Sequence, residues 1–63
     1  MKITKGQASA IARYGEAACL EAARLVDEVG NGDGYIACEY DISRTQAGCI
    51  IEAGRLLREE QTP

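Results

Sequence analysis

Carboxylates are the side chains through which this chain could bind or react, because its 63 residues include ten Asp and Glu and no histidine. Residues 27–41 hold five acids and no base, a net charge of −5, whereas the rest of the chain carries +2. Concentrated acidic side chains steer association toward basic surfaces. A solvated loop kept soluble by its charge is the alternative explanation. The candidate partner-binding residues are Asp27, Glu28, Asp33, Glu39 and Asp41.

The sequence contains few residue patterns that could support catalysis. It contains no histidine base, no nucleophile motif and no phosphate-binding loop of the GxxxxGK type. The two helices expected below offer no cleft in which paired carboxylates would be desolvated. We therefore expect a protein that is not an enzyme and that needs no cofactor.

Three widely spaced cysteines, Cys19, Cys38 and Cys49, form no C-x-x-C pair. An odd number of cysteines does not fit the disulfide framework of a secreted protein, and their spacing does not indicate a metal site. The glycine-rich stretch 30–34 also lacks the anchoring ligands of a calcium loop. Each cysteine falls on a face expected to point inward, where it would act as a small hydrophobe.

The elements that must position these side chains begin with a helix over about 4–29. Thr4 is its expected N-cap, and Gln7 completes a capping box. Apolar residues then recur at helical spacing on one stripe, which includes Gly15. Gly30 ends the pattern, and residues 30–34 form a glycine-rich acidic turn.

Residues 35–42 alternate between apolar and polar, with Ile36, Cys38, Tyr40 and Ile42 facing one way. A period of two with β-branched and aromatic residues predicts a half-buried strand. Its pairing stays open among residues 1–3, a second copy in a dimer, or no partner.

A second helix follows over about 43–60, beginning at Ser43 with Gln46 three residues later. The expected fold is therefore one mainly α domain over residues 1–63. It is a two-helix hairpin with a Gly-rich acidic turn and a short extended or β segment between the helices. Leu20 and Ile51 lie off the inner stripes, either as isolated surface residues or as contacts with the strand or a dimer partner.

The two helix starts also resemble each other. Residues 3–15 match residues 42–54 at Ile, Gln, Ala, Ile and Gly, from either gene duplication or shared capping requirements. Glycines inside the helices are costly, and Gly48 on the outer face fits either tolerated drift or close approach by a partner.

Arg44 occupies the first turn of the second helix, beside Thr45 and Gln46. We expect it to pair with nearby Asp41. Such a helix start could also begin a DNA-recognition helix in a dimeric regulator. The acidic balance, with a net charge of −3, disfavours direct nucleic-acid binding without excluding it.

In size, charge and the acidic stretch 27–41, the whole chain resembles the very small acidic proteins that phages encode against host defences, anti-CRISPR proteins among them. The resemblance implies a non-enzymatic inhibitor, a DNA mimic. Its acidic patch would occupy a basic nucleic-acid-binding surface, such as a CRISPR effector subunit. It would act in the cytoplasm of a bacterial host, consistent with no apolar run that could span a membrane and no signal peptide. A small dimeric DNA-binding regulator and a self-associating structural protein are the alternatives.

Overall fold

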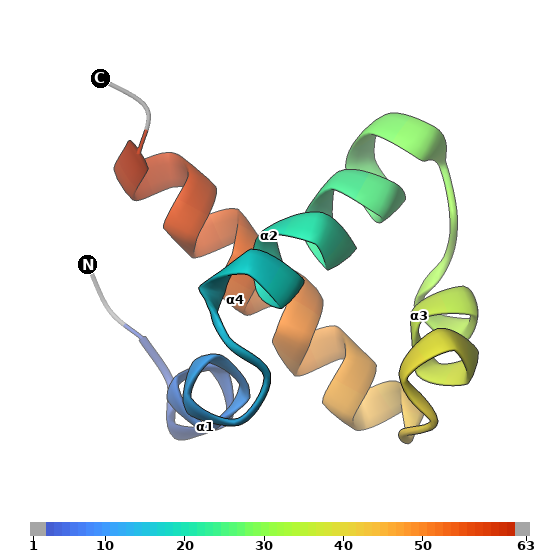
Figure 1. Ribbon diagram of the computed structural model, residues 1–63, viewed down its shortest axis with the longest axis horizontal. Helices are drawn as coiled ribbons and strands as arrows, with labels where there is room; N and C mark the ends of the chain where they lie inside the picture. The colour runs from blue at the N-terminus through green and yellow to red at the C-terminus, as the bar shows by residue number, and fades with distance from the viewer. Residues whose placement is uncertain (1–2, 62–63) are drawn as a thin grey trace.

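The computed structural model describes residues 3–61, and over these residues its regular secondary structure is all helix, without a strand (Figure 1). The expected two-helix hairpin with a β segment is wrong. The elements are α1 (Lys5–Tyr14), α2 (Glu16–Arg24), the π-helical turn η1 (Leu25–Val29), α3 (Asp33–Tyr40) and α4 (Arg44–Gln61).

The helix expected over 4–29 is broken at Gly15. This glycine has φ +90° and ψ 158°, a conformation that only glycine adopts cheaply, and its N–H donates to the carbonyl of Ile11. It is exposed rather than part of a packing stripe. The capping box of Thr4 and Gln7 at the start of α1 is confirmed.

The end expected at Gly30 is also confirmed. Residues Leu25–Val29 widen into the π-helical turn, and Gly30 follows in the left-handed region with φ +92°. The N–H of Asn31 donates to the carbonyl of Leu25. Asp27, which lies in this turn, contacts Arg55 of α4.

The strand expected over 35–42 is wrong, because residues Asp33–Tyr40 form α3. A helix satisfies its own backbone hydrogen bonds, whereas a single strand needs a partner, and no described segment supplies one. Ile36 and Tyr40 are four residues apart and share a helix face. Ile36 is fully buried, and the Tyr40 hydroxyl donates to the carbonyl of Ala18. The Tyr40 ring also meets Tyr14 edge-on, with centroids 6.0 Å apart.

Helix α4 is the central element, and α1, α2 and α3 all pack against it (Figure 1). The sequence left the surroundings of Leu20 and Ile51 open. Ile51 is buried in the core cluster, and the partly buried Leu20 packs against that cluster. The buried apolar residues are Ala10, Cys19, Ala22, Ala23, Ile36, Ala37, Ala47, Ile50, Ile51, Ala53 and Leu57.

Two glycines let neighbouring helices approach α4 closely. A Cβ atom at Gly54 would lie 1.9 Å from the carbonyl oxygen of Cys19 on α2. A Cβ atom at Gly6 on α1 would lie 2.9 Å from Sγ of Cys49. The matched glycines of the repeat therefore differ in role, since Gly15 breaks a helix and Gly54 allows a crossing.

Within residues 3–61, no helix is both long enough and apolar enough to cross a membrane.

Candidate functional site

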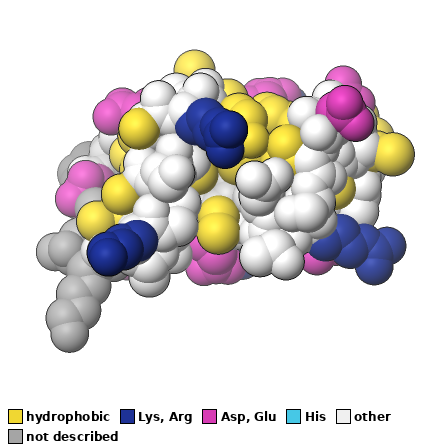
Figure 2. Space-filling model, turned by 90° about the horizontal axis from the view of Figure 1, so that it is seen from below, with side chains coloured by type: hydrophobic (Ala, Val, Ile, Leu, Met, Phe, Trp, Pro, Cys, Tyr) yellow, Lys and Arg dark blue, Asp and Glu magenta, His cyan; other side chains and the backbone are white. Residues whose placement is uncertain are grey.

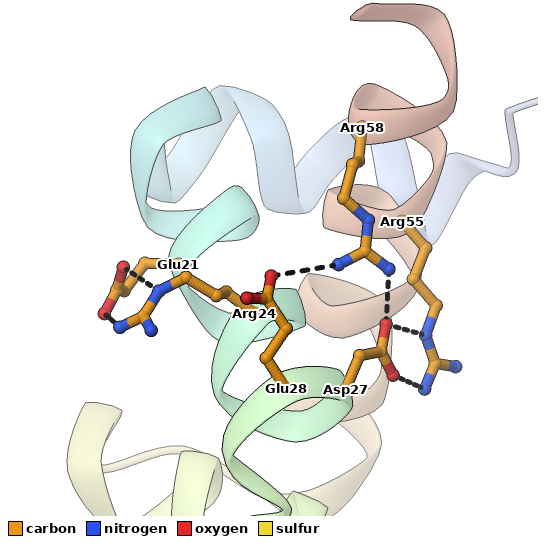
Figure 3. Close-up of polar contacts among 6 residues, drawn as sticks. All are labelled: Glu21, Arg24, Asp27, Glu28, Arg55 and Arg58. Carbon is orange, nitrogen blue, oxygen red and sulfur yellow. Dashed lines mark hydrogen bonds and ion pairs between the residues drawn. The ribbon is translucent and has the colours of Figure 1, made fainter. Parts of the chain in front are cut away.

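Two of the five candidate acids are engaged by arginines of α4. The carboxylate of Asp27 accepts hydrogen bonds from Arg55, with Oδ1 2.7 Å from Nη2, and from Arg58 (Figure 3). Oε2 of Glu28 lies 4.0 Å from Nη1 of Arg58. These contacts join η1 to α4; Asp27 is closely paired, whereas Glu28 is mostly exposed and only at the edge of ion-pair distance from Arg58.

The hydrogen bonds from Arg55, and then those from Arg58, lower the pKa of Asp27 from its usual 3.8 to about 2. Because this pKa is lower in the folded than in the unfolded chain, ionised Asp27 stabilises the fold above pH 3.8. That contribution is lost progressively as the pH falls toward 2.

We expect Asp27→Asn to lower the melting temperature at neutral pH, and the difference from the parent protein to shrink between about pH 4 and about pH 2. Melting followed by circular dichroism across this range checks it. Glu39→Gln is the control, since Glu39 forms no ion pair within residues 3–61. A constant difference between the Asp27 variant and the parent at every pH would contradict the assignment.

The other three candidate acids lie on α3 or directly after it. Asp33 is in the first turn of α3, Glu39 is near its end, and Asp41 follows it with φ +56°. All three are exposed and make no ion pair in the described part of the chain. The structure thus divides the acidic stretch into a paired half on η1 and an unpaired half on α3.

Helices α3 and α4 are joined by a turn of three residues, Asp41, Ile42 and Ser43. The N–H of Ile42 donates to the carbonyl of Ala37, and that of Asp41 to Cys38, which together form a Schellman motif. Ile42 packs against the core, and the hydroxyl of Ser43 accepts from the N–H of Gln46, capping α4 as expected. We call α3, this turn and α4 the helix–turn–helix unit, because a turn of this length joins the two helices of helix–turn–helix motifs.

The first turn of α4 is exposed at Arg44, Thr45 and Gln46, while Ala47 begins its buried face. Arg44 forms no ion pair with Asp41, so the expected pair is wrong. Its guanidinium lies instead beside Gly34 of α3, where an added Cβ would be 3.2 Å from Nη2. The sequence analysis missed α3 as the first helix of this unit, because it predicted a strand over residues 35–42. The i, i+4 spacing of Ile36 and Tyr40 could have indicated a helix there.

A hollow of about 390 Å³ lies over the outer face of α4. Figure 2 shows the lower side of the molecule, where hydrophobic side chains are exposed near the middle and charged side chains are spaced around them. The hollow is lined by Thr4, Gln7, Val26, Asp33, Thr45, Gly48, Cys49, Ile51, Glu52 and Arg55.

The cysteines do not share one environment. Cys19 is buried, Cys49 is half-buried and Cys38 is exposed, so the expectation that all three point inward is wrong for Cys38. Burial, and to a smaller extent Glu16, raises the pKa of Cys19. No group of three or more potential metal ligands gathers within residues 3–61.

In comparisons with known protein families, curated proteins and solved structures, nothing matches this chain.

Proposed function

We propose that this protein binds double-stranded DNA through the helix–turn–helix unit, with the first turn of α4 placed in the major groove. The observation that carries the proposal is the three-residue turn, which presents Arg44, Thr45 and Gln46 at an exposed helix start. In helix–turn–helix proteins the N-terminal residues of the second helix contact base edges.

The three exposed side chains have the chemistry that this contact needs. Arginine forms bidentate hydrogen bonds with guanine, and glutamine does so with adenine. Threonine offers both a hydroxyl group and a methyl group to bases. Each good bidentate contact contributes ~1–3 kcal/mol of discrimination.

Charge limits how tightly a single copy can bind. Neutralised phosphates supply much of the affinity of DNA-binding proteins, and this chain has a net charge of −3. Asp33 and Asp41 also lie in the same unit without ion pairs in the described structure. The proposal therefore includes a homodimer that engages two half-sites about one helical turn apart.

Fluorescence anisotropy tests DNA binding with a labelled pool of random duplexes of about 30 base pairs, long enough for two half-sites. We expect binding at about 50 mM salt that weakens steeply as salt rises. On duplexes that the parent protein enriches from this pool, Arg44→Ala should reduce the affinity at least about tenfold, through loss of a bidentate contact.

Arg24→Ala is the matched control, because it removes the same charge from α2, where Arg24 pairs with Glu21. Circular dichroism of both variants verifies that they remain folded. The proposal fails if the parent protein does not bind the duplex pool at low salt, or if Arg44→Ala and Arg24→Ala weaken DNA binding equally.

A second candidate function is supported by the three unpaired carboxylates on α3 and its turn, Asp33, Glu39 and Asp41. In this alternative the protein is a non-enzymatic, anti-CRISPR-like inhibitor that docks these acids on a basic nucleic-acid-binding surface of a host defence complex. Asp27 and Glu28 would contribute less, because arginines of α4 already engage them. Capture of a CRISPR effector by the tagged protein, with release at moderate salt, tests this alternative.

A further inference from the structure

We propose that the hollow over α4 binds a small organic cation, an aliphatic primary ammonium. The hollow lies on the outer face of α4, between the start of α1 on one side and η1 with the start of α3 on the other. Its volume of about 390 Å³ is in the range of small-molecule sites. The half-buried Val26 and Cys49 supply most of the apolar surface for an aliphatic chain, since Ile51 is only 5% exposed.

Gly48 is the residue that leaves this hollow open. Glycine is unfavourable in a helix interior, and Gly48 lies well inside α4. A Cβ at Gly54 or Gly6 would lie close to atoms of a neighbouring helix, whereas a Cβ at Gly48 would meet nothing within 4 Å. Packing within the chain therefore does not require glycine here. A side chain at this position would instead project into the hollow.

The charge of the lining selects a cation. The lining contains two carboxylates, those of Asp33 and Glu52, and one guanidinium, that of Arg55, so its net charge is −1. Arg55 donates Nε–H and Nη2–H to Asp27 and Nη1–H to Glu52, so each of its three nitrogens already donates to a carboxylate. Asp33 has no ion pair within residues 3–61 and is the natural partner of an ammonium group.

The hollow shares Thr45 with the exposed first turn of α4. A bound cation would therefore lie where the helix approaches DNA. Competition between the ligand and DNA rests on the proposed function, whereas binding of the ligand itself does not. The site would make DNA binding responsive to a small amine.

Titration of the ¹⁵N-labelled protein, followed by amide chemical shifts, tests ligand binding directly. The probes are n-hexylammonium, 1-hexanol and hexanoate, which share an apolar chain and differ in charge. We expect saturable shifts around Gly48 and Asp33 with n-hexylammonium, and at least tenfold weaker binding of the other two. Equal binding of all three probes, or no saturable shift with n-hexylammonium, overturns the proposal.

Substitutions localise the site. Asp33→Asn should weaken n-hexylammonium binding at least fivefold, whereas Glu39→Gln, which removes a carboxylate from α3 outside the hollow lining, should not change it. Gly48→Leu should abolish binding while circular dichroism shows an intact fold. Unchanged affinity in the Asp33 variant overturns the proposal even if the Gly48 variant does not fold.

Two further measurements are needed. The first distinguishes a free amine from a lysine side chain as the ligand, and the second distinguishes failure of the cation site from failure of the proposed DNA binding. A blocked lysine, Nα-acetyl-lysine methylamide, presents the same ammonium group on a peptide. Tighter binding of this compound than of n-hexylammonium would overturn the assignment to a free small molecule. Displacement of labelled DNA by n-hexylammonium supports competition. If the protein binds no DNA, the shift titration still decides whether the cation site exists.

Discussion

Replacing Gly54 with alanine is expected to unfold much of the protein. The added Cβ would lie 1.9 Å from the carbonyl oxygen of Cys19 and 2.6 Å from its carbonyl carbon, both backbone atoms of α2. Because backbone cannot rotate away, α2 must move off α4, which is the most extensive helix contact in the core. Overpacking typically costs ~1–3 kcal/mol, and a clash with backbone belongs at the upper end of that range or beyond it, whereas alanine returns only about 1 kcal/mol in helix propensity. A core of this size supplies roughly 3–5 kcal/mol in total. Urea unfolding followed by circular dichroism measures the loss.

Gly48→Ala is the matched control on the same helix. Its Cβ would meet nothing within 4 Å, so we expect this substitution to raise the stability by up to about 1 kcal/mol. Opposite signs for the two variants would confirm that Gly54 is required by the helix crossing. Equal effects would show that the crossing is less tight than the structure indicates.

Neutralising the three unpaired acids is expected to change binding strongly, and in opposite directions for the two candidate functions. The triple variant carries Asp33→Asn, Glu39→Gln and Asp41→Asn. Asparagine suits position 41 because it tolerates the left-handed conformation found there, with φ +56°. If the protein binds DNA, removal of three charges near the phosphates should raise the affinity roughly tenfold at low salt. If it docks on a basic protein, partner binding should be lost.

The control variant removes three acids elsewhere, Glu16→Gln, Glu59→Gln and Glu60→Gln. It has the same net charge as the triple variant, but its changes lie on α2 and at the end of α4. Anisotropy with DNA and capture of a CRISPR effector are measured for both variants. An equal response of the two variants would show that only total charge matters and would contradict both proposals.

Helix ends were predictable from the sequence because their signals lie within a few residues of each other. The capping box of Thr4 and Gln7, the cap at Ser43 and the end at Gly30 each depend on short-range hydrogen bonds or on one backbone conformation. Residues 35–42 were mispredicted because their alternation also fits a helix with Ile36 and Tyr40 on one face. Burial of Ile36 and the contact of Tyr40 with α2 stabilise that helix.

The candidate site shows the same division. The sequence located the acids and the polar start of the second helix, because charge and polarity are properties of single residues. It did not show that Asp27 pairs with Arg55, 28 positions away, or that Asp33 stays unpaired. Nor did it show that Gly15 breaks a helix, that Gly48 leaves a hollow open or that Gly54 admits a crossing helix. Short-range capping and charge follow from neighbouring residues, whereas these pairings and approaches exist only once α1, α2 and α3 have packed on α4.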